Sequence, residues 1–282
     1  MLTLTQSTWQ NEYDQTIYRV HQKHENEKAA IGFVHGLGEH IHRYEHVFET
    51  FAAQGYSIYG FDSVGHGRSE GKKGHVNSLL QWMNELEMLY TWMRETTNKP
   101  IVFYGHSLGG FKSLIYSLQG GNLPEALIVT SPFLGEANPS SGLKIAVGKF
   151  ASNFAPKFIL PNGLDIDCLS RKKDVVNAYL ADELIHANIS LKMASVIFSG
   201  AAWIMDASNH KLAVPALIQH GDHDGITDFT CTETFATTVQ GEINWKAWEG
   251  GFHELHNDSI SEEMLTYTSQ WLSQTISGIT SK

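Results

Sequence analysis

The chain of 282 residues contains only two cysteines, Cys168 and Cys231, which lie far apart in the sequence. Two cysteines are too few for a disulfide scaffold, and this count is typical of a reducing compartment, with room for one bridge at most. Basic residues are scarce too: 20 Lys and Arg stand against 30 Asp and Glu, a formal net charge of −10. Without a dense Lys/Arg stripe to neutralise phosphates, nucleic-acid binding is not expected.

Long hydrophobic runs are also missing. No stretch approaches about 18 consecutive apolar residues, so no transmembrane helix is predicted. The first segment is polar from Thr3 onward and has no basic stretch followed by an apolar one, so no signal peptide is predicted. These absences predict a soluble, cytoplasmic protein, or one that associates peripherally with a membrane.

The chain does have the composition of a folded domain, with 42% hydrophobic and 18% charged residues. Short apolar runs alternate with helical patterns, which favours βαβ units and a mostly parallel sheet. The runs that we interpret as strands cover residues 29–36, 56–62, 100–107, 125–133, 214–222 and 243–251. Residues 78–95 carry apolar side chains at helical spacing, as expected for a helix that packs on the core.

A segment from about residue 136 to residue 212 breaks this alternation. We therefore predict a core built from residues 1–135 and 213–282, with residues 136–212 inserted between two strands of its sheet. Within the insertion, residues 143–160 have near-helical spacing of Leu143, Ala146, Val147, Phe150, Phe154 and Phe158. Pro156 is expected to kink or end that helix.

The segment "GHSLG" at residues 105–109 matches the pattern G-x-S-x-G. It follows a predicted strand and precedes a helical pattern, which is the setting of a nucleophile elbow. There, the glycines let strand and helix approach closely while Ser107 adopts a strained backbone conformation. The alternative is a tight turn that cradles a phosphate, but no lysine follows as in a P-loop and the glycine spacing is wrong for a dinucleotide motif. We predict that Ser107 is a nucleophile.

A serine hydroxyl becomes a good nucleophile only with a base and a carboxylate that orients the base. Behind such an elbow the acid and then the histidine follow later strands. For the base we favour His253, directly after the last strand and a Gly-Gly turn, over His256, which is expected to pack on or cap the next helix. For the acid we favour Asp224 over Asp222, which is expected to stabilise the turn, as is Asp228.

Two backbone donors are needed to stabilise the oxyanion of a tetrahedral intermediate. One is the amide of Leu108, directly after the nucleophile. The segment "VHGLGEH" at residues 34–40 ends an early strand, and Leu37 is well placed there to offer the second N–H. The alternative is that these glycines only form a turn.

The 15 histidines raise the question of a metal site. His40 and His42 form one candidate pair, and His220, Asp222 and His223 form another group. Neither has a further ligand at a supporting spacing. We expect no metal and no other cofactor.

At these residues the sequence resembles monoacylglycerol lipases and the related lysophospholipase-like serine hydrolases of the α/β-hydrolase superfamily. "HGLGEHIHRYEHV" is similar to the family's segment H-G-x-G-E-H-x-x-R-Y, and "FDSVGHGRSEGKKGHV" to its segment D-x-x-G-H-G-x-S-x-G-x-x-G-H-V. "GHSLGG" and "GFHELHND" complete the set. "SPFLGEANP" and "LSRKKDVVNAYLADELIH" are similar to the family's cap, so the likeness runs from about residue 28 to 272.

The resemblance implies an α/β-hydrolase fold, with a mostly parallel central sheet flanked by helices and an inserted helical cap at residues 136–212. It implies a catalytic triad of Ser107, Asp224 and His253, and an oxyanion hole formed by the amides of Leu37 and Leu108. The implied reaction is hydrolysis of a monoacylglycerol ester to free fatty acid and glycerol through an acyl-enzyme. Alternatives are a lysophospholipase or general carboxylesterase and, more remotely, a non-catalytic hydrolase-fold binding protein.

The family's cap is lined with apolar side chains that accept an acyl chain and can touch membranes. In this chain the same segment carries Lys144, Lys149 and Lys157, which is compatible with docking on an anionic lipid surface. The alternative is a cap helix that packs on its own domain. Glu183 stands where the family often has proline, which is expected to alter only a local turn. Oligomeric state, acyl-chain length and head-group preference stay open.

Overall fold

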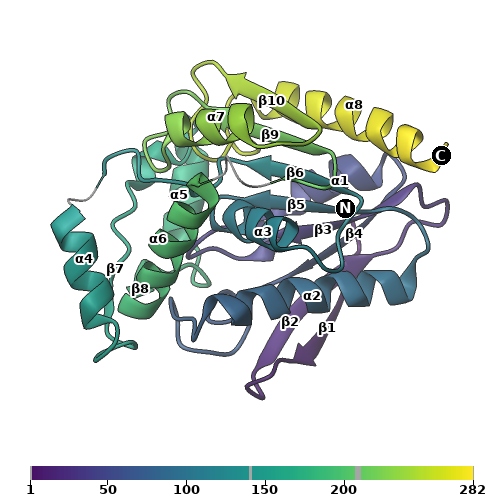
Figure 1. Cartoon of the computed structure of the whole chain (residues 1–282). Coiled ribbons are helices and arrows are strands. Elements are labelled where there is room, and N and C mark those ends of the chain that lie inside the picture. Colours follow the sequence, from purple (N-terminus) through teal and green to yellow (C-terminus); the bar gives the residue numbers. More distant parts are fainter. Residues whose placement is uncertain (1, 140–141, 207–210, 282) are drawn as a thin grey trace.

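The protein folds around an eight-stranded sheet (Figure 1). The computed structural model describes residues 2–139, 142–206 and 211–281, without the side chains of residues 143–145 and 147. The strands of the sheet are β1 (Thr5–Gln10), β2 (Thr16–Gln22), β3 (Ala29–Val34), β4 (Tyr56–Phe61), β5 (Ile101–His106), β6 (Ala126–Thr130), β9 (Ala216–Gly221) and β10 (Ile243–Trp248). They lie in the order β1-β2-β4-β3-β5-β6-β9-β10.

The predicted mostly parallel sheet is confirmed. From β4 to β10 all neighbours pair in parallel, and each predicted apolar run forms one of these strands. β2 pairs antiparallel with both β1 and β4. The hairpin of β1 and β2 is an addition that the sequence analysis does not predict, because β1 is a largely exposed strand of polar residues at the sheet edge.

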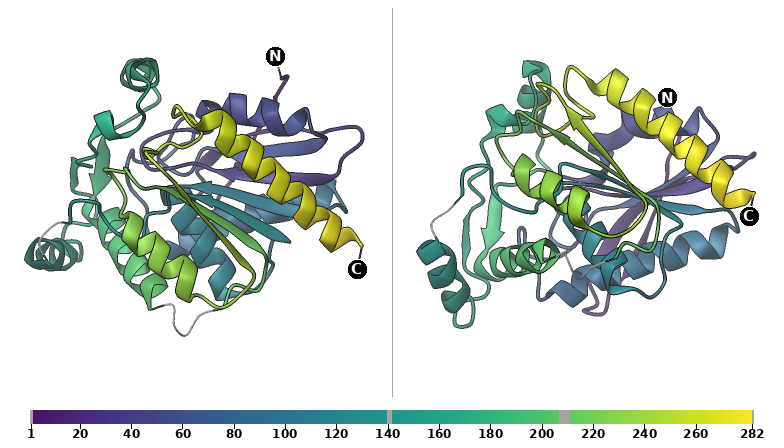
Figure 2. Two further views of the ribbon diagram at one scale, coloured as in Figure 1. Left: turned by 90° about the horizontal axis from the view of Figure 1, so that it is seen from above. Right: turned by 45° about the horizontal axis from the view of Figure 1, so that its top comes forward.

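Helices cover both faces of the sheet, which explains why its strands read as continuous apolar runs (Figures 1 and 2). α2 (Leu79–Thr96), α3 (Leu108–Gln119) and α7 (Phe229–Thr238) pack on one face, and α1 (Glu45–Ala52) and α8 (Ser261–Thr280) on the other. Successive residues of β5 alternate between these layers: Phe103 belongs to the first cluster and Tyr104 to the second.

Between β6 and β9 the chain leaves the sheet. It forms α4 (Gly142–Ala151), β7 (Ile159–Pro161), a 3-10 turn η2 (Ile166–Cys168), α5 (Lys173–Ala181), β8 (Asn188–Ser190) and α6 (Leu191–Met205). β7 and β8 make a separate antiparallel pair, and Figure 2 shows this group of elements on one side of the sheet. Glu183 lies exposed in the turn after α5. Among the described helices, none is both long and apolar enough to cross a bilayer.

The sequence predicts a helix over residues 143–160. The observed helix α4 ends at Ala151, before Pro156, and is therefore shorter than predicted. A turn follows, in which the Ser152 hydroxyl donates to the Lys149 carbonyl (2.6 Å). Such bonds from a serine to nearby backbone carbonyls compete with continued helix formation. The predicted positions Leu143, Lys144 and Val147 lie outside the described side chains.

The start of α3 packs against the end of β3, and this contact leaves no room for a side chain at Gly109. A Cβ there would lie 1.9 Å from the Val34 carbonyl oxygen and 2.7 Å from that of His35. We expect Gly109→Ala to lower the free energy of unfolding by about 3 kcal/mol, measured by chemical denaturation. Gly278→Ala is the matched control, because a Cβ there meets nothing within 4 Å, and it should stabilise α8 by about 0.5 kcal/mol. Equal stability of the two variants would contradict this packing.

Candidate active site

Ser107 occupies the sharp turn between β5 and α3. Its backbone has φ 53° and ψ −117°, a conformation that costs a non-glycine residue about 1–3 kcal/mol. The turn is held by hydrogen bonds from the Ser107 N–H to Thr130 O (2.9 Å) and from the Phe111 N–H to Ser107 O (2.9 Å). Glycine is needed at position 105, since a Cβ there would lie 2.6 Å from the Gly109 carbonyl oxygen. Strand, strained serine and helix form the geometry that the sequence predicts for an elbow.

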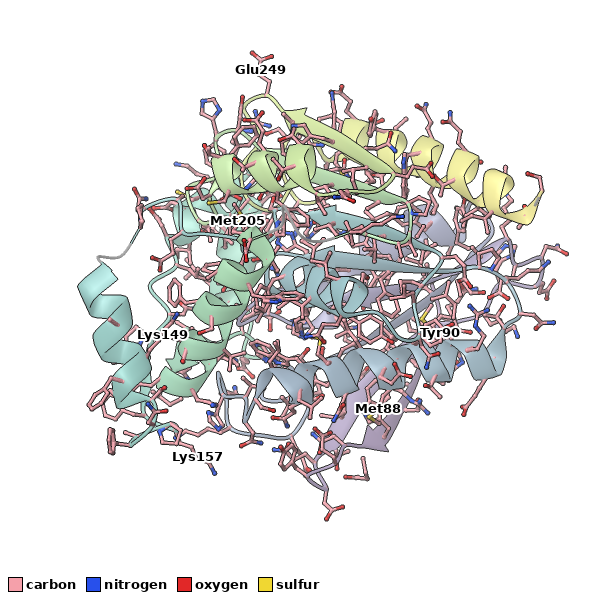
Figure 3. All side chains as sticks on the ribbon, in the orientation of Figure 1. Met88, Tyr90, Lys149, Lys157, Met205 and Glu249 are labelled. Carbon is pink, nitrogen blue, oxygen red and sulfur yellow. The ribbon has the colours of Figure 1, made fainter. Side chains whose placement is uncertain are left out.

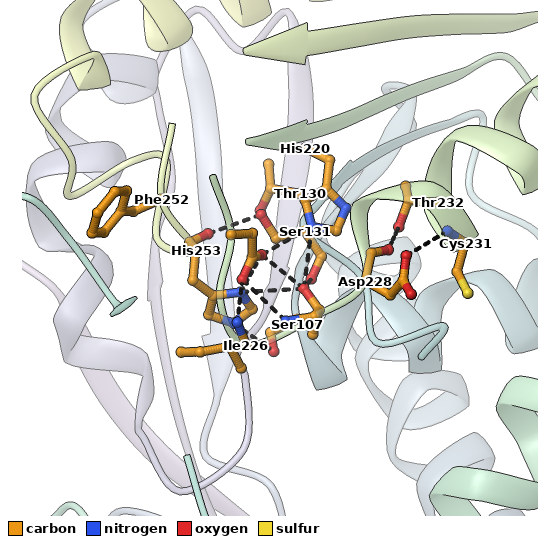
Figure 4. Close-up of polar contacts among 12 residues, drawn as sticks. Ser107, Thr130, Ser131, His220, Ile226, Asp228, Cys231, Thr232, Phe252 and His253 are labelled. Carbon is orange, nitrogen blue, oxygen red and sulfur yellow. Dashed lines mark hydrogen bonds and ion pairs between the residues drawn. The ribbon is translucent and has the colours of Figure 1, made fainter. Parts of the chain in front are cut away.

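Ser107, His253 and Asp224 form a chain of hydrogen bonds. Figure 4 shows Ser107 and His253 within this network of polar contacts. The Ser107 Oγ lies 3.0 Å from His253 Nε2, and His253 Nδ1 lies 2.7 Å from Asp224 Oδ2. Because the carboxylate accepts the proton on Nδ1, Nε2 is free to accept the serine proton. All three residues are buried, on the loops after β5, β9 and β10.

Asp224 is surrounded by donors. Its Oδ1 accepts the backbone N–H groups of Ile226 (2.8 Å) and Thr227 (3.0 Å), and its Oδ2 also lies 2.9 Å from His220 Nε2. Burial acts to raise the pKa of Asp224, but His253 and the hydrogen bond from His220 outweigh it and hold that pKa well below its usual range. These donors therefore favour the charged form of the carboxylate.

The other residues that the sequence analysis considered beside Asp224 and His253 make contacts that stabilise the fold. Asp222 accepts the N–H of Gly250 (2.6 Å), which joins two neighbouring turns, and Asp228 caps α7 through the N–H of Cys231 (2.9 Å). Of the two roles expected for His256, capping of α8 is wrong, because the N-cap of α8 is Ile260 and it has no side-chain cap bond. It is buried, stacks on Tyr44 with ring centroids 4.7 Å apart, and its carbonyl oxygen lies 2.8 Å from Nε2 of His46 on α1.

The histidines considered as metal ligands make hydrogen bonds instead. His40 bonds to Asp182 (2.8 Å), His42 to Glu45 (2.6 Å), and His223 to Asp222 (2.7 Å). Within the part of the chain that the structure describes, no group of three or more His, Cys, Asp or Glu side chains is arranged to hold a metal ion. Both cysteines are free.

Leu37 and Leu108 lie beside Ser107 along one cavity of about 350 Å³. The loop that carries Leu37 comes close to the serine: a Cβ on Gly36 would lie 3.3 Å from Ser107 Cβ. Leu108 begins α3, so its N–H belongs to the positive end of the helix dipole. The two residues predicted to supply the amide donors thus line the same cavity as Ser107.

The cavity is lined mainly by apolar side chains from both the sheet domain and the inserted segment. They are Leu37, Leu108, Phe133, Leu160, Leu164, Ile189, Leu191, Ile197, Phe198 and Ile226. Polar groups, among them Glu136, Asn162 and Asp165, lie at other points of the lining. An apolar cavity with a few polar groups suits a ligand that combines an alkyl chain with a small polar head.

An ion-pair cluster that the sequence analysis missed supports the loop that carries His253. The Arg43 guanidinium bridges Glu39 (2.6 Å) and Glu254 (2.5 Å), next to His253, and both carboxylates are buried. Tyr179 of α5 packs 4.9 Å from the same guanidinium. "HGLGEHIHRYEHV" contains Glu39 and Arg43, but no local pattern connects them with Glu254, over 200 residues later.

The protonation of His253 gives a testable pH dependence. Burial lowers its pKa, but the charge of Asp224 and the hydrogen bond to it outweigh burial, so the pKa of His253 lies above 6.5. A histidine that acts as the base must be neutral, so activity should fall as the pH drops through this raised pKa. We expect the acid limb of kcat/KM for a water-soluble short ester to have its midpoint above pH 6.5. A midpoint below 6.5 would contradict this electrostatic arrangement.

Fold and site together define a class of protein: a serine hydrolase with the α/β-hydrolase fold. Comparison with known families agrees, because residues 25–260 match the family Hydrolase_4, described as serine aminopeptidase, S33. The chain belongs to this family, and it is a carboxylic ester hydrolase.

Individual relatives cover nearly the whole chain. It is 36% identical over 251 residues to an uncharacterized abhydrolase domain-containing protein of Dictyostelium discoideum, a match that covers 88% of this chain but 26% of that protein. It is 28% identical over 259 residues to a monoacylglycerol lipase of Mycolicibacterium smegmatis, with 91% and 92% covered. The crystal structure of Paleococcus ferrophilus monoacylglycerol lipase superposes with a TM-score of 0.81 at 27% identity and covers 97% of this chain and 100% of that one.

Proposed function

We propose that the protein hydrolyses the ester bond of a monoacylglycerol to a free fatty acid and glycerol. The observation that carries this proposal is the hydrogen-bonded chain of Ser107, His253 and Asp224 beside a largely apolar cavity. The names of several relatives, which are monoacylglycerol or monoglyceride lipases, support the substrate class.

In the proposed mechanism, Ser107 attacks the ester carbonyl while His253 takes its proton. Asp224 holds the imidazole and stabilises its charged form. The oxyanion accepts hydrogen bonds from the amides of Leu37 and Leu108. Glycerol leaves with the proton from His253, and water, activated by the same histidine, then hydrolyses the acyl-enzyme.

A substrate panel tests this function. We expect higher kcat/KM for a monoacylglycerol than for lysophosphatidylcholine, a short p-nitrophenyl ester or an aminoacyl p-nitroanilide, with each assayed below its critical micelle concentration. The panel includes the anilide because the family description names an aminopeptidase. Faster turnover of lysophosphatidylcholine or the short ester would assign one of the alternative esterase activities, and faster turnover of the anilide would assign a peptidase.

We further propose that residues 136–212 act as a cap over the site and dock on anionic lipid surfaces. Phe150, Phe154 and Phe158 are 67%, 76% and 58% exposed, which disfavours a segment that packs only on its own domain. Lys149 and Lys157 lie in the same segment (Figure 3). Apolar side chains flanked by lysines suit the interface of a negatively charged bilayer.

Vesicle sedimentation tests the docking. The wild type should bind vesicles of phosphatidylcholine with phosphatidylglycerol more tightly than vesicles of phosphatidylcholine alone, and the triple variant Phe150→Ser/Phe154→Ser/Phe158→Ser should bind both weakly. Leu80→Ser is the control, because Leu80 is 65% exposed on α2, outside the inserted segment. Equal binding by the triple variant and the wild type would overturn the docking proposal.

A further inference from the structure

The loop between β3 and α1 carries a buried histidine that has no part in the mechanism above. His35 is 1% exposed, and both nitrogens of its ring are hydrogen-bonded. Nδ1 lies 2.8 Å from the Gly36 carbonyl oxygen, and Nε2 lies 2.9 Å from the backbone nitrogen of Ser63. The ring therefore joins the loop that contains Leu37 to the loop that follows β4.

These two partners fix the tautomer of His35. The backbone N–H of Ser63 can only donate, so Nε2 must accept and cannot carry a proton. The proton is then on Nδ1, where it is donated to the Gly36 carbonyl. Burial, together with the neighbouring His66 and Lys112, lowers the pKa of His35 well below 6.5, so the ring stays neutral.

The hydrogen bond to Gly36 sets the direction of the next amide. In a trans peptide the C=O and the following N–H point in opposite directions in one plane. With the Gly36 carbonyl turned toward His35, the Leu37 N–H points away from that ring. Leu37 and Ser107 line the same cavity, and an oxyanion donor on Leu37 must point from the loop into that cavity.

The other polar group of Gly36 is fixed as well. Its N–H donates to Glu39 Oε1 (2.6 Å), which also accepts the Tyr44 hydroxyl (2.6 Å). A Cβ at Gly36 would lie 2.8 Å from that same carboxylate oxygen. Both the N–H and the carbonyl of Gly36 are thus hydrogen-bonded. Rotation of the Gly36–Leu37 peptide would break the hydrogen bond to His35.

We propose that His35 is a positioning residue, whose neutral imidazole, protonated on Nδ1, orients the Gly36–Leu37 peptide so that the Leu37 N–H faces the developing oxyanion. The proposal rests on the proposed function, because it assigns Leu37 as an oxyanion donor. His35 does not touch the substrate. It acts by preorganising a dipole before the substrate binds.

Two substitutions separate the two hydrogen bonds of the ring. The side-chain amide of His35→Asn reaches the position of Nδ1 and can still donate to the Gly36 carbonyl. The longer side chain of His35→Gln reaches the position of Nε2 and can accept from Ser63, but it leaves the Gly36 carbonyl unbound. Each variant loses one hydrogen bond, so the two form a matched pair for stability.

For both variants we would measure kcat, KM, and the affinity for two probes. One is an acyl trifluoromethyl ketone, which forms a hemiketal oxyanion on a nucleophilic serine. The other is a monoalkyl glyceryl ether, which binds without reaction. His35→Gln should lose about 10²–10³-fold in kcat and a similar factor in ketone affinity, with KM and ether affinity unchanged. His35→Asn should stay within about tenfold of the wild type in every measurement.

The outcomes distinguish this inference from the proposed function. Equal ketone affinities for the two variants, or a His35→Gln variant as active as the wild type, overturn the role of His35 alone. A wild type that neither binds the ketone nor hydrolyses esters overturns the proposed function. Should neither variant fold, ¹⁵N spectra of the wild-type imidazole give the answer: a His35 that stays protonated on Nδ1 from about pH 5 to 9 supports the proposal, and an Nε2–H tautomer overturns it.

Discussion

Replacing Ser107 with alanine is expected to lower kcat for ester hydrolysis by a factor on the order of 10⁶, because the variant lacks the hydroxyl that His253 Nε2 would deprotonate. The elbow itself should persist, since the backbone bonds of Ser107 to Thr130 and Phe111 do not involve its hydroxyl. Fatty-acid release under single-turnover conditions measures the effect, and the melting temperature should stay close to that of the wild type.

Ser131→Ala is the matched control for this change. Ser131 is also a buried serine with a positive φ (44°), and its hydroxyl donates to the backbone carbonyl of His253 (2.8 Å) rather than facing Nε2. We expect it to lower kcat by less than about tenfold, as for one lost neutral hydrogen bond. Comparable losses in the two variants would contradict a special role for Ser107.

Asp224→Asn should lower kcat by about 10⁴-fold, as found for the same change in other serine hydrolases with such a triad. An asparagine amide nitrogen next to His253 Nδ1 would donate a proton rather than accept one. The imidazole would then carry its proton on Nε2, which could no longer accept the proton of Ser107. The same amide nitrogen would also face His220 Nε2, which lies 2.9 Å from Asp224 Oδ2 in the wild type. Two donors would then face each other.

The comparison for this variant is Asp222→Asn, two residues away on the same loop. Asp222 holds the N–H of Gly250 and the ring of His223, and both contacts tolerate an amide oxygen. We expect at most about a twofold change in kcat, within the usual range for surface substitutions. If Asp222→Asn lost more activity than Asp224→Asn in a steady-state assay, the choice of the acid would be wrong.

The sheet and the elbow could be predicted because their signals are local. The parallel strands β3, β4, β5, β6 and β9 are buried on both faces and appear as apolar runs, and glycines flank Ser107 where strand and helix touch. The positions of Asp224 and His253 follow from chain order, because loops after parallel strands meet at one edge of the sheet.

Contacts between distant segments could not be predicted in this way. The bridge from Arg43 to Glu254 depends on which side chains the fold brings together. The end of α4 at Ala151 also differs from the periodic pattern, which continues into residues that are largely exposed. Periodicity of apolar residues predicts a helix only where that face has a core to pack against.

The most direct test of the account is to trap the covalent intermediate. The enzyme would be mixed with a monoacylglycerol, quenched with acid within one turnover, and analysed by intact mass and peptide mapping. The account predicts a mass increase of one acyl group, located on Ser107 and absent in Ser107→Ala. An acyl group on another residue, or rapid single-turnover hydrolysis with no adduct at any time point, would contradict it.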